Sequence, residues 1–206
     1  VNAAAPAELA SISNAHDLTL VHVSSDYIFD GTVKVHPEEE LPSPLSAYGA
    51  SKAAGDTEAQ TAPQHYVIRT SWFFGDGENF MSTMRRLATK GVEPKVIHDQ
   101  RGRPTFAEDL AKGIVHLLKS DADYGVYNLS NSGDTVGRDE IAMAVFIGLG
   151  HDPAELEVPI VQIVRLEREG RVQLRTRDVG ELASADREVG VAEVVRVRGE
   201  EGRETV

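Results

Sequence analysis

The chain has 206 residues, of which 41% are hydrophobic and 26% are charged, a composition typical of a globular protein with one substantial core. Its formal net charge of -12 argues against nucleic acid as a partner, because binding to a phosphate backbone requires clustered lysine and arginine. The sequence contains no cysteine and no apolar run close to the roughly 20 residues of a membrane span, so we predict a cytoplasmic protein without disulfides or a membrane partner.

Strand and helix patterns alternate along the first 70 residues. In chain order they predict a helix over 3–15, a buried strand over 18–23, an irregular segment over 24–44, a helix over 45–60 and a second strand over 65–70. Leu9 and Ile12 share one face of the first helix, and Ser46 is a candidate N-cap of the second. An irregular segment as long as 24–44 is commonly functional in a compact domain.

The same alternation continues to about residue 150. Here the patterns predict a helix over 79–89, a short strand over 95–97, a helix over 107–118, a strand over 126–129 and a helix over 138–149. Four apolar residues share one face of the third of these elements: Leu110, Ile114, Leu117 and Leu118. Strands that alternate with helices predict an α/β fold with a mainly parallel sheet.

Residues 160–206 differ in character from the rest of the chain. They contain no aromatic residue, histidine, lysine or methionine, and they show no sustained helical or strand periodicity. Three interpretations remain open: a solvated tail, a divergent extra subdomain, or a non-native stretch such as a shifted reading frame. The composition favours poor ordering.

Tyr48 and Lys52 are four residues apart on the predicted helix over 45–60, and such residues lie on the same helix face. An ammonium ion about 4 Å from a phenol stabilises the phenolate by roughly 4 kcal/mol at an effective dielectric constant of about 20. Two exposed helix residues are the commoner explanation of this spacing. The context favours chemistry, because Ser24, Ser25 and Asp26 leave an apolar strand where ligands bind to parallel sheets.

Four stretches, "VHVSSDYIFDG", "PSPLSAYGASKAAGD", "VIRTSWFFGDGENF" and "DQRGRPTFAEDLA", occur in series. In order and spacing the chain resembles the extended short-chain dehydrogenase/reductases, and among them the dTDP-4-dehydrorhamnose reductases, from residue 1 to about 151. The resemblance implies a Rossmann-like parallel sheet with a small substrate-binding portion. It also implies reduction of dTDP-4-dehydro-β-L-rhamnose to dTDP-L-rhamnose by hydride from NADPH or NADH.

Carried over by motif, the resemblance implies a catalytic set of Ser25, Tyr48 and Lys52. Tyr48 would donate a proton to the ketone oxygen, and Ser25, where the family commonly carries threonine, would bind the same oxygen. Lys52 would acidify the phenol and, with Tyr48, contact the nicotinamide ribose.

The resemblance also implies a set of substrate-binding residues. Asp26 would contact the deoxysugar, Trp72 would pack against the sugar ring, and Arg103 would pair with a pyrophosphate oxygen, with Arg101 as the alternative. Asn2 corresponds to an asparagine that often supports the site in this family. Each of these side chains could instead be an ordinary core or surface residue.

The glycine-rich pattern G-x-x-G-x-x-G, with which this family binds the cofactor pyrophosphate, does not occur in the 206 residues. We therefore expect an N-terminally truncated fragment that lacks the first strands and, by itself, binds NADPH weakly and is inactive. The expected divisions are the rest of the Rossmann domain over 1–70, a substrate portion mixed with Rossmann elements over 71–159, and the atypical tail over 160–206.

Two other functions remain open at this level. Nucleotide-sugar epimerases and dehydratases share the tyrosine–lysine spacing but regenerate their cofactor. A regulatory subunit of methionine adenosyltransferase has the same fold and resembles these motifs without requiring a proton relay. The sequence leaves homodimerisation and the use of magnesium undecided.

Overall fold

The computed structural model describes residues 1–92, 94–97, 99–120 and 122–152, and the backbone of three short strands beyond them. The chain forms two compact units by its internal contacts. Unit 1 comprises Val1–Phe73, Thr105–Ser132 and Val191–Val206, and unit 2 comprises Phe74–Pro104 and Gly133–Gly190.

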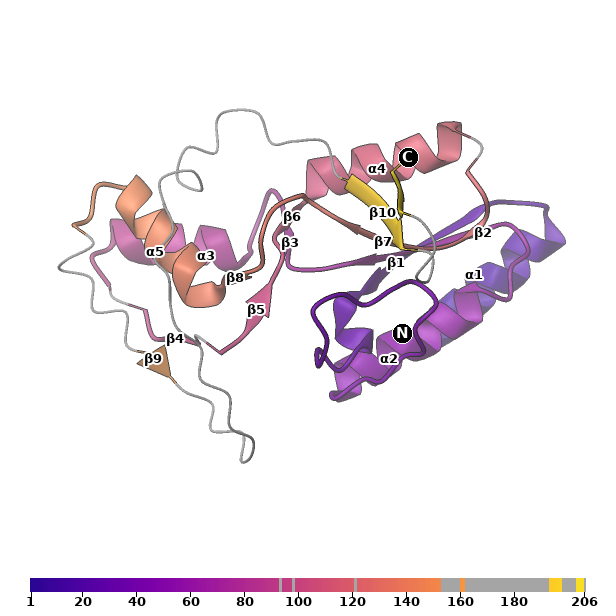
Figure 1. Cartoon of the computed structure of the whole chain (residues 1–206), viewed down its shortest axis with the longest axis horizontal. Coiled ribbons are helices and arrows are strands. Elements are labelled where there is room, and N and C mark those ends of the chain that lie inside the picture. The colour runs from indigo at the N-terminus through magenta and orange to yellow at the C-terminus, as the bar shows by residue number, and fades with distance from the viewer. Residues whose placement is uncertain are drawn as a thin grey trace. The chain divides into compact units, whose positions relative to one another are not determined.

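Unit 1 is built on a five-stranded sheet with the order β1-β2-β7-β10-β11 (Figure 1). Its strands are β1 (Leu20–Ser25), β2 (His65–Thr70), β7 (Gly125–Ser130), β10 (Glu193–Val197) and β11 (Arg203–Thr205). The first three are parallel, with β2 between β1 and β7, and β10 and β11 are added antiparallel. All but the first residue of β2 are buried, which explains its apolar, β-branched sequence.

Helices cover both faces of this sheet. Helices α1 (Ala4–Ala15) and α2 (Ala47–Ala59) pack side by side on one face, and α4 (Ala107–Lys119) packs on the other (Figure 1). The core under α4 consists of Tyr66, Ile68, Leu110, Leu117, Tyr127 and Leu129. The core under α1 and α2 consists of Ala10, Leu20, Ala59, Ala62 and Val67. Neighbouring residues of β2 therefore enter opposite cores, and the predicted Rossmann-like α/β fold with a parallel sheet is confirmed.

The face of α1 that carries Leu9 and Ile12 is not the face that packs into the core. Leu9 and Ile12 are 50% and 43% exposed, whereas the helix buries Pro6, Ala10 and Ser13. The small residues are buried because α2 approaches this part of the chain closely: a Cβ atom at Gly55 would collide with the carbonyl oxygen of Asn2, just before α1, and crowd the side chain of Pro6.

Helix α4 behaves as predicted except at its end. Leu110 and Leu117 are buried and Ile114 is partly buried against the same core. Leu118, which was expected on the same face, is 46% exposed. One residue beyond Leu117 the helix has turned by about 100°, which carries this side chain to the rim.

Unit 2 is smaller and is held by two helices. Helices α3 (Phe80–Thr89) and α5 (Arg138–Gly148) enclose a core of Met84, Ala88, Val96, Ala142 and Phe146. Two short sheets join them: β4 (Val96–Ile97) pairs with β9 (Ile160–Val161), and β5 (Arg101–Gly102) pairs with β8 (Val136–Gly137). A further two-stranded sheet consists of β6 (Thr105–Phe106), which belongs to unit 1, and β3 (Phe73–Phe74), where the chain leaves unit 1. The predicted helices and the strand over 95–97 are confirmed.

Most of the atypical segment over 160–206 lies outside the described residues, which include only the backbone of β9, β10 and β11 there. The three interpretations of that segment stay predictions. Within the described part of the chain, every helix is too short or too polar to cross a lipid bilayer.

Replacement of Gly49 by alanine should destabilise the chain. Alanine normally stabilises a helix interior by about 1 kcal/mol relative to glycine. Here a Cβ atom would collide with the carbonyl oxygen of Tyr27, and overpacking of this kind costs about 1–3 kcal/mol. Urea unfolding should show a lower free energy of unfolding for Gly49→Ala and little change for Ala54→Ser, an exposed position on the same helix. A more stable Gly49→Ala variant would contradict this packing.

Candidate active site

The candidate site begins where β1 ends. Ser25 is the last residue of β1 and the N-cap of a short 3-10 helix, η1 (Asp26–Ile28), because its Oγ accepts a hydrogen bond of 3.2 Å from the backbone N–H of Tyr27. The same Oγ donates to Asp26 Oδ1 at 3.2 Å. Both groups therefore lie at the carboxyl end of a parallel strand, where α/β proteins bind their ligands.

Helix α2 brings Tyr48 and Lys52 to this strand end. It begins at the predicted N-cap, since Ser46 Oγ accepts from the backbone N–H of Gly49 at 3.0 Å. The Tyr48 ring meets the Tyr27 ring edge to face, with 5.9 Å between ring centroids. One turn further on, Lys52 Nζ donates to the carbonyl oxygen of Val23 in β1 at 2.7 Å. The structure thus brings the tyrosine, the lysine and the strand-end serine to one edge of the sheet.

The environment perturbs two ionisable groups of the site. Burial raises the pKa of Asp26 to about 6, against hydrogen bonds and the charge of His36, which lower it. Burial lowers the pKa of Lys52, and the Asp56 carboxylate acts in the opposite direction. Tyr48 is 52% exposed, and within the described residues its hydroxyl makes no hydrogen bond. The phenol is therefore accessible to a ligand from outside.

A buried ion pair beneath α2 holds these residues in place. Arg69 Nε of β2 lies 3.1 Å from Asp56 Oδ2, and His22 Nε2 lies 3.6 Å from the other carboxylate oxygen. The same guanidinium donates to the carbonyl oxygen of Glu38 at 2.9 Å and lies over the Phe29 ring. Sequence reasoning missed this cluster. The available signals were an arginine inside an apolar strand and an aspartate one helical turn after Lys52.

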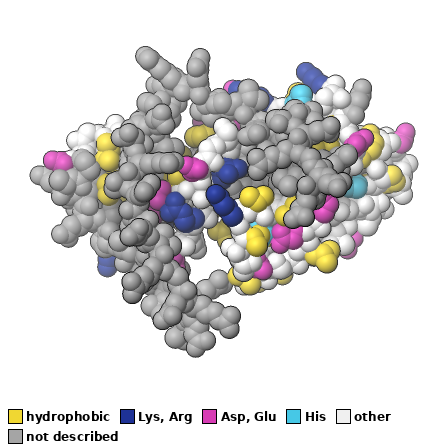
Figure 2. Space-filling view, viewed as in Figure 1, with side chains coloured by type: hydrophobic (Ala, Val, Ile, Leu, Met, Phe, Trp, Pro, Cys, Tyr) yellow, Lys and Arg dark blue, Asp and Glu magenta, His cyan; other side chains and the backbone are white. Residues whose placement is uncertain are grey.

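The predicted functional segment over 24–44 is tied to the carboxyl ends of the strands. Glu38 Oε1 accepts a hydrogen bond from the backbone N–H of Asn128 in β7 at 3.0 Å, and Asn128 Nδ2 donates to the carbonyl oxygen of His36 at 2.8 Å. The segment also carries exposed apolar side chains such as Leu41. Figure 2 shows exposed hydrophobic side chains over the surface that this segment and α2 occupy in Figure 1.

Two further predicted residues belong to unit 1. Trp72 follows β2, next to the strand that carries Ser25, and its φ of 37° is rare for a residue other than glycine. Its carbonyl oxygen accepts from the backbone N–H of Thr105 at 3.0 Å, which helps to hold the turn. Asn2 Nδ2 donates to Ser51 Oγ at 3.0 Å, and this links α1 to the first turns of α2.

The two candidate arginines lie in unit 2. Arg101 is engaged, because its guanidinium contacts Glu140 Oε1 and donates to the carbonyl oxygen of Thr135, both at 2.9 Å. Arg103 is partly buried and follows β5. Among the residues whose side chains are described, no group of three or more histidine, aspartate or glutamate residues could hold a metal ion.

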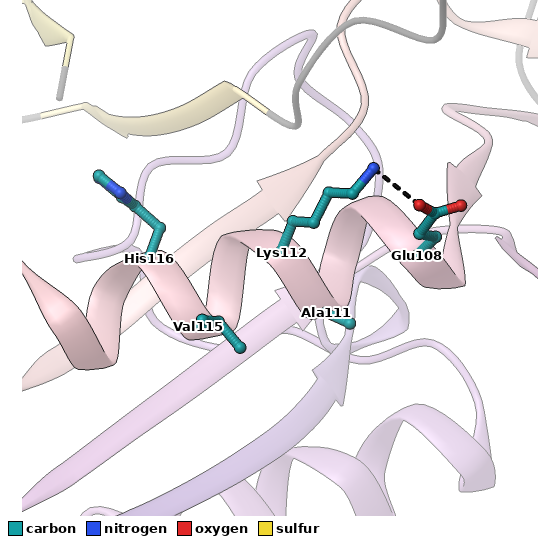
Figure 3. Close-up of a pocket in the computed structure, with 5 residues that line it drawn as sticks. All are labelled: Glu108, Ala111, Lys112, Val115 and His116. Atoms are coloured by element: carbon teal, nitrogen blue, oxygen red, sulfur yellow. Dashed lines mark ion pairs between the residues drawn. The ribbon is translucent and has the colours of Figure 1, made fainter.

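A shallow pocket lies elsewhere, on the outer surface of α4 (Figure 3). Glu108, Ala111, Lys112, Val115 and His116 line it, all from the one helix. Lys112 is paired there with Glu108 at 2.9 Å. Because α4 and α2 cover opposite faces of the sheet, this depression is unrelated to Tyr48 and Lys52.

Fold and site together define a Rossmann-like α/β protein with a serine, a tyrosine and a lysine at a strand end. The chain belongs to the family of the RmlD substrate binding domain, whose model matches residues 1–177. It is 36% identical over 158 residues to dTDP-4-dehydrorhamnose reductase of Mycolicibacterium smegmatis, a match that covers 74% of this chain and 48% of that relative. The same-named protein of Salmonella typhimurium is 37% identical over 150 residues, which cover 69% and 50%.

Solved structures agree with this assignment. The crystal structure of dTDP-4-dehydrorhamnose reductase from Bacillus anthracis in complex with NADP superposes with a TM-score of 0.68 at 35% identity. The match covers 71% of this chain and 53% of that chain. The family resemblance seen in the sequence is thus confirmed, and the chain spans about half the length of the curated relatives it matches.

Removal of the Asp56 carboxylate should be strongly destabilising. Asp56→Asn leaves the Arg69 guanidinium buried without its counterion, and loss of one partner of such a pair costs about 3–5 kcal/mol. The exposed pair of Arg86 and Glu78 is the control, since Glu78→Gln should cost less than about 1 kcal/mol. Urea unfolding measures both.

The double variant Asp56→Leu/Arg69→Met should recover most of the stability that Asp56→Asn loses, because neither charge then remains buried alone. Equal stability of Asp56→Asn and Glu78→Gln would show that the buried pair does not hold α2 on the sheet.

Proposed function

We propose that the chain carries the catalytic half of a reductase that converts dTDP-4-dehydro-β-L-rhamnose to dTDP-L-rhamnose. The observation that carries the proposal is the convergence of Ser25, Tyr48 and Lys52 on the carboxyl end of β1, in a chain that belongs to this family. Its matched relatives bear the name dTDP-4-dehydrorhamnose reductase.

In the proposed mechanism, Tyr48 donates a proton to the ketone oxygen while the Ser25 hydroxyl binds the same oxygen. The accessible phenol and the nearby strand-end hydroxyl support these roles. The Lys52 ammonium stabilises the phenolate that remains after proton transfer. Asp56, one turn along α2, opposes the effect of burial and favours the charged form of Lys52.

A reduced nicotinamide cofactor, NADPH or NADH, supplies the hydride when it is bound. Lys52 fits a role in holding it: an ammonium group has three donors, and the Val23 carbonyl engages one of them here. The remaining donors suit the hydroxyls of a ribose, as does the Tyr48 hydroxyl. On the substrate, Asp26 and Trp72 would contact the deoxysugar, and Arg103 would pair with a pyrophosphate oxygen.

Tyr48→Phe should lower turnover by about 10²–10⁴-fold, because the phenol proton is lost while the ring is kept. The assay follows the absorbance of reduced nicotinamide in the full-length gene product supplied with the 4-dehydro sugar. Tyr27→Phe is the matched control: it alters the adjacent tyrosine and should leave turnover within about twofold.

Binding of the nucleotide sugar should change little in Tyr48→Phe, since the hydroxyl acts on the reacting oxygen only. Full activity of this variant would remove Tyr48 from the mechanism. Turnover of the sugar without net consumption of reduced nicotinamide would instead identify an epimerase.

A further inference from the structure

The single proton of the Ser25 hydroxyl is already engaged in this structure. Ser25 Oγ donates a hydrogen bond to Asp26 Oδ1 at 3.2 Å and accepts a second one from the backbone N–H of Tyr27 at 3.2 Å. Because a serine hydroxyl has one proton, this arrangement leaves only a lone pair for a ligand. A ketone oxygen, which can only accept, finds no donor at Ser25 in this state. An alcohol, which can donate, does find an acceptor.

We propose that Asp26 is a positioning residue for Ser25, and that its protonation state decides whether Ser25 donates to a ketone or accepts from an alcohol. The inference rests on the proposed function, in which Ser25 binds the reacting oxygen. It adds to that function that protonation of Asp26 selects whether the site binds the ketone or the alcohol.

The geometry permits the reversal without rearrangement. When Asp26 takes up a proton from solvent, its carboxylic O–H can donate to Ser25 Oγ along the hydrogen bond that now runs the other way. The serine proton is then released toward a ketone oxygen. When Asp26 ionises again, it releases its proton to solvent, the Ser25 O–H again donates its hydrogen bond to the carboxylate, and Ser25 Oγ accepts a hydrogen bond from the alcohol product. The only covalent change is the gain or loss of the Asp26 proton, which exchanges with solvent.

The surroundings of Asp26 place this change near neutral pH. Burial raises its pKa to about 6, while the hydrogen bonds from Ser25 and the backbone, and the charge of His36, lower it. Tyr27 lies beside it on η1, and Tyr48 and Lys52 are the titratable groups at the start of α2. His36 is itself 2.9 Å from a carboxylate oxygen of Glu40, which offsets part of its charge.

A direct test is a ¹³C NMR titration of the aspartate side-chain carboxyls. The Asp26 signal, identified by its loss in Asp26→Asn, should titrate near pH 6. Ser25→Ala should shift its midpoint upward, because it removes a donor that stabilises the carboxylate. Asp30, whose pKa is lowered by its hydrogen bonds to Thr32, is the internal control and should not respond. An Asp26 midpoint that is unchanged or lowered in Ser25→Ala would overturn the proposal.

A second test uses the pH profile of ketone reduction in the full-length gene product. The value of kcat/KM should fall toward tenfold per pH unit above the Asp26 midpoint, since the ketone-binding form of Ser25 is then depleted. That fall should disappear in Asp26→Asn, which cannot titrate, and persist in Asp30→Asn. An Asp26→Asn variant with the wild-type profile would refute the coupling.

Complete absence of reduction in the wild-type full-length protein would refute the proposed function, and the NMR titration would still decide whether Asp26 controls the serine proton. If Asp26 served folding alone, Asp26→Asn would lower activity at every pH without changing the shape of the pH profile of kcat/KM. The two failures are therefore distinguishable.

Discussion

The buried ion pair between Arg69 and Asp56 is the interaction on which the arrangement of the site depends. Their side chains are 5% and 1% exposed, so each charge requires the other. The pair locks helix α2 to strand β2 in one register. Tyr48, Lys52 and Asp56 follow one another at intervals of four residues and so share one face of α2. Once Asp56 is fixed in the core, Lys52 reaches the end of β1 and Tyr48 emerges at the surface.

The same guanidinium also organises the long segment before α2. It donates to the Glu38 carbonyl and lies over Phe29, whose ring stacks on His36 at 4.5 Å. Glu38 and His36 are in turn bonded to Asn128 of β7. One buried arginine thereby connects β2, α2 and the segment that follows Asp26. Burial is the largest cause of the raised pKa of Asp26, and His36 of the same segment opposes it.

Close backbone packing completes the site. The glycines of α2 allow the helix to touch the chain on both sides: Gly49 lies against the Tyr27 carbonyl and Gly55 against Asn2. A Cβ atom at either position would collide with a backbone carbonyl oxygen, so a larger residue would force α2 away from these segments. The small residues of α2, which give the helix only weak hydrophobic patterning, are therefore required for its close packing against Tyr27 and Asn2.

Local patterns in the sequence determined the helices, the strands, the N-cap at Ser46 and the common face of Tyr48 and Lys52, because these depend on neighbours within a few residues. Only the tertiary structure decided that α1 buries small residues in place of Leu9 and Ile12. It alone paired Arg69 with Asp56. The local sequence gave no indication that Ser25 donates a hydrogen bond to Asp26, or that burial raises the pKa of this aspartate. Burial and the distance between helices arise from segments far apart in the chain, and so no local pattern encodes them.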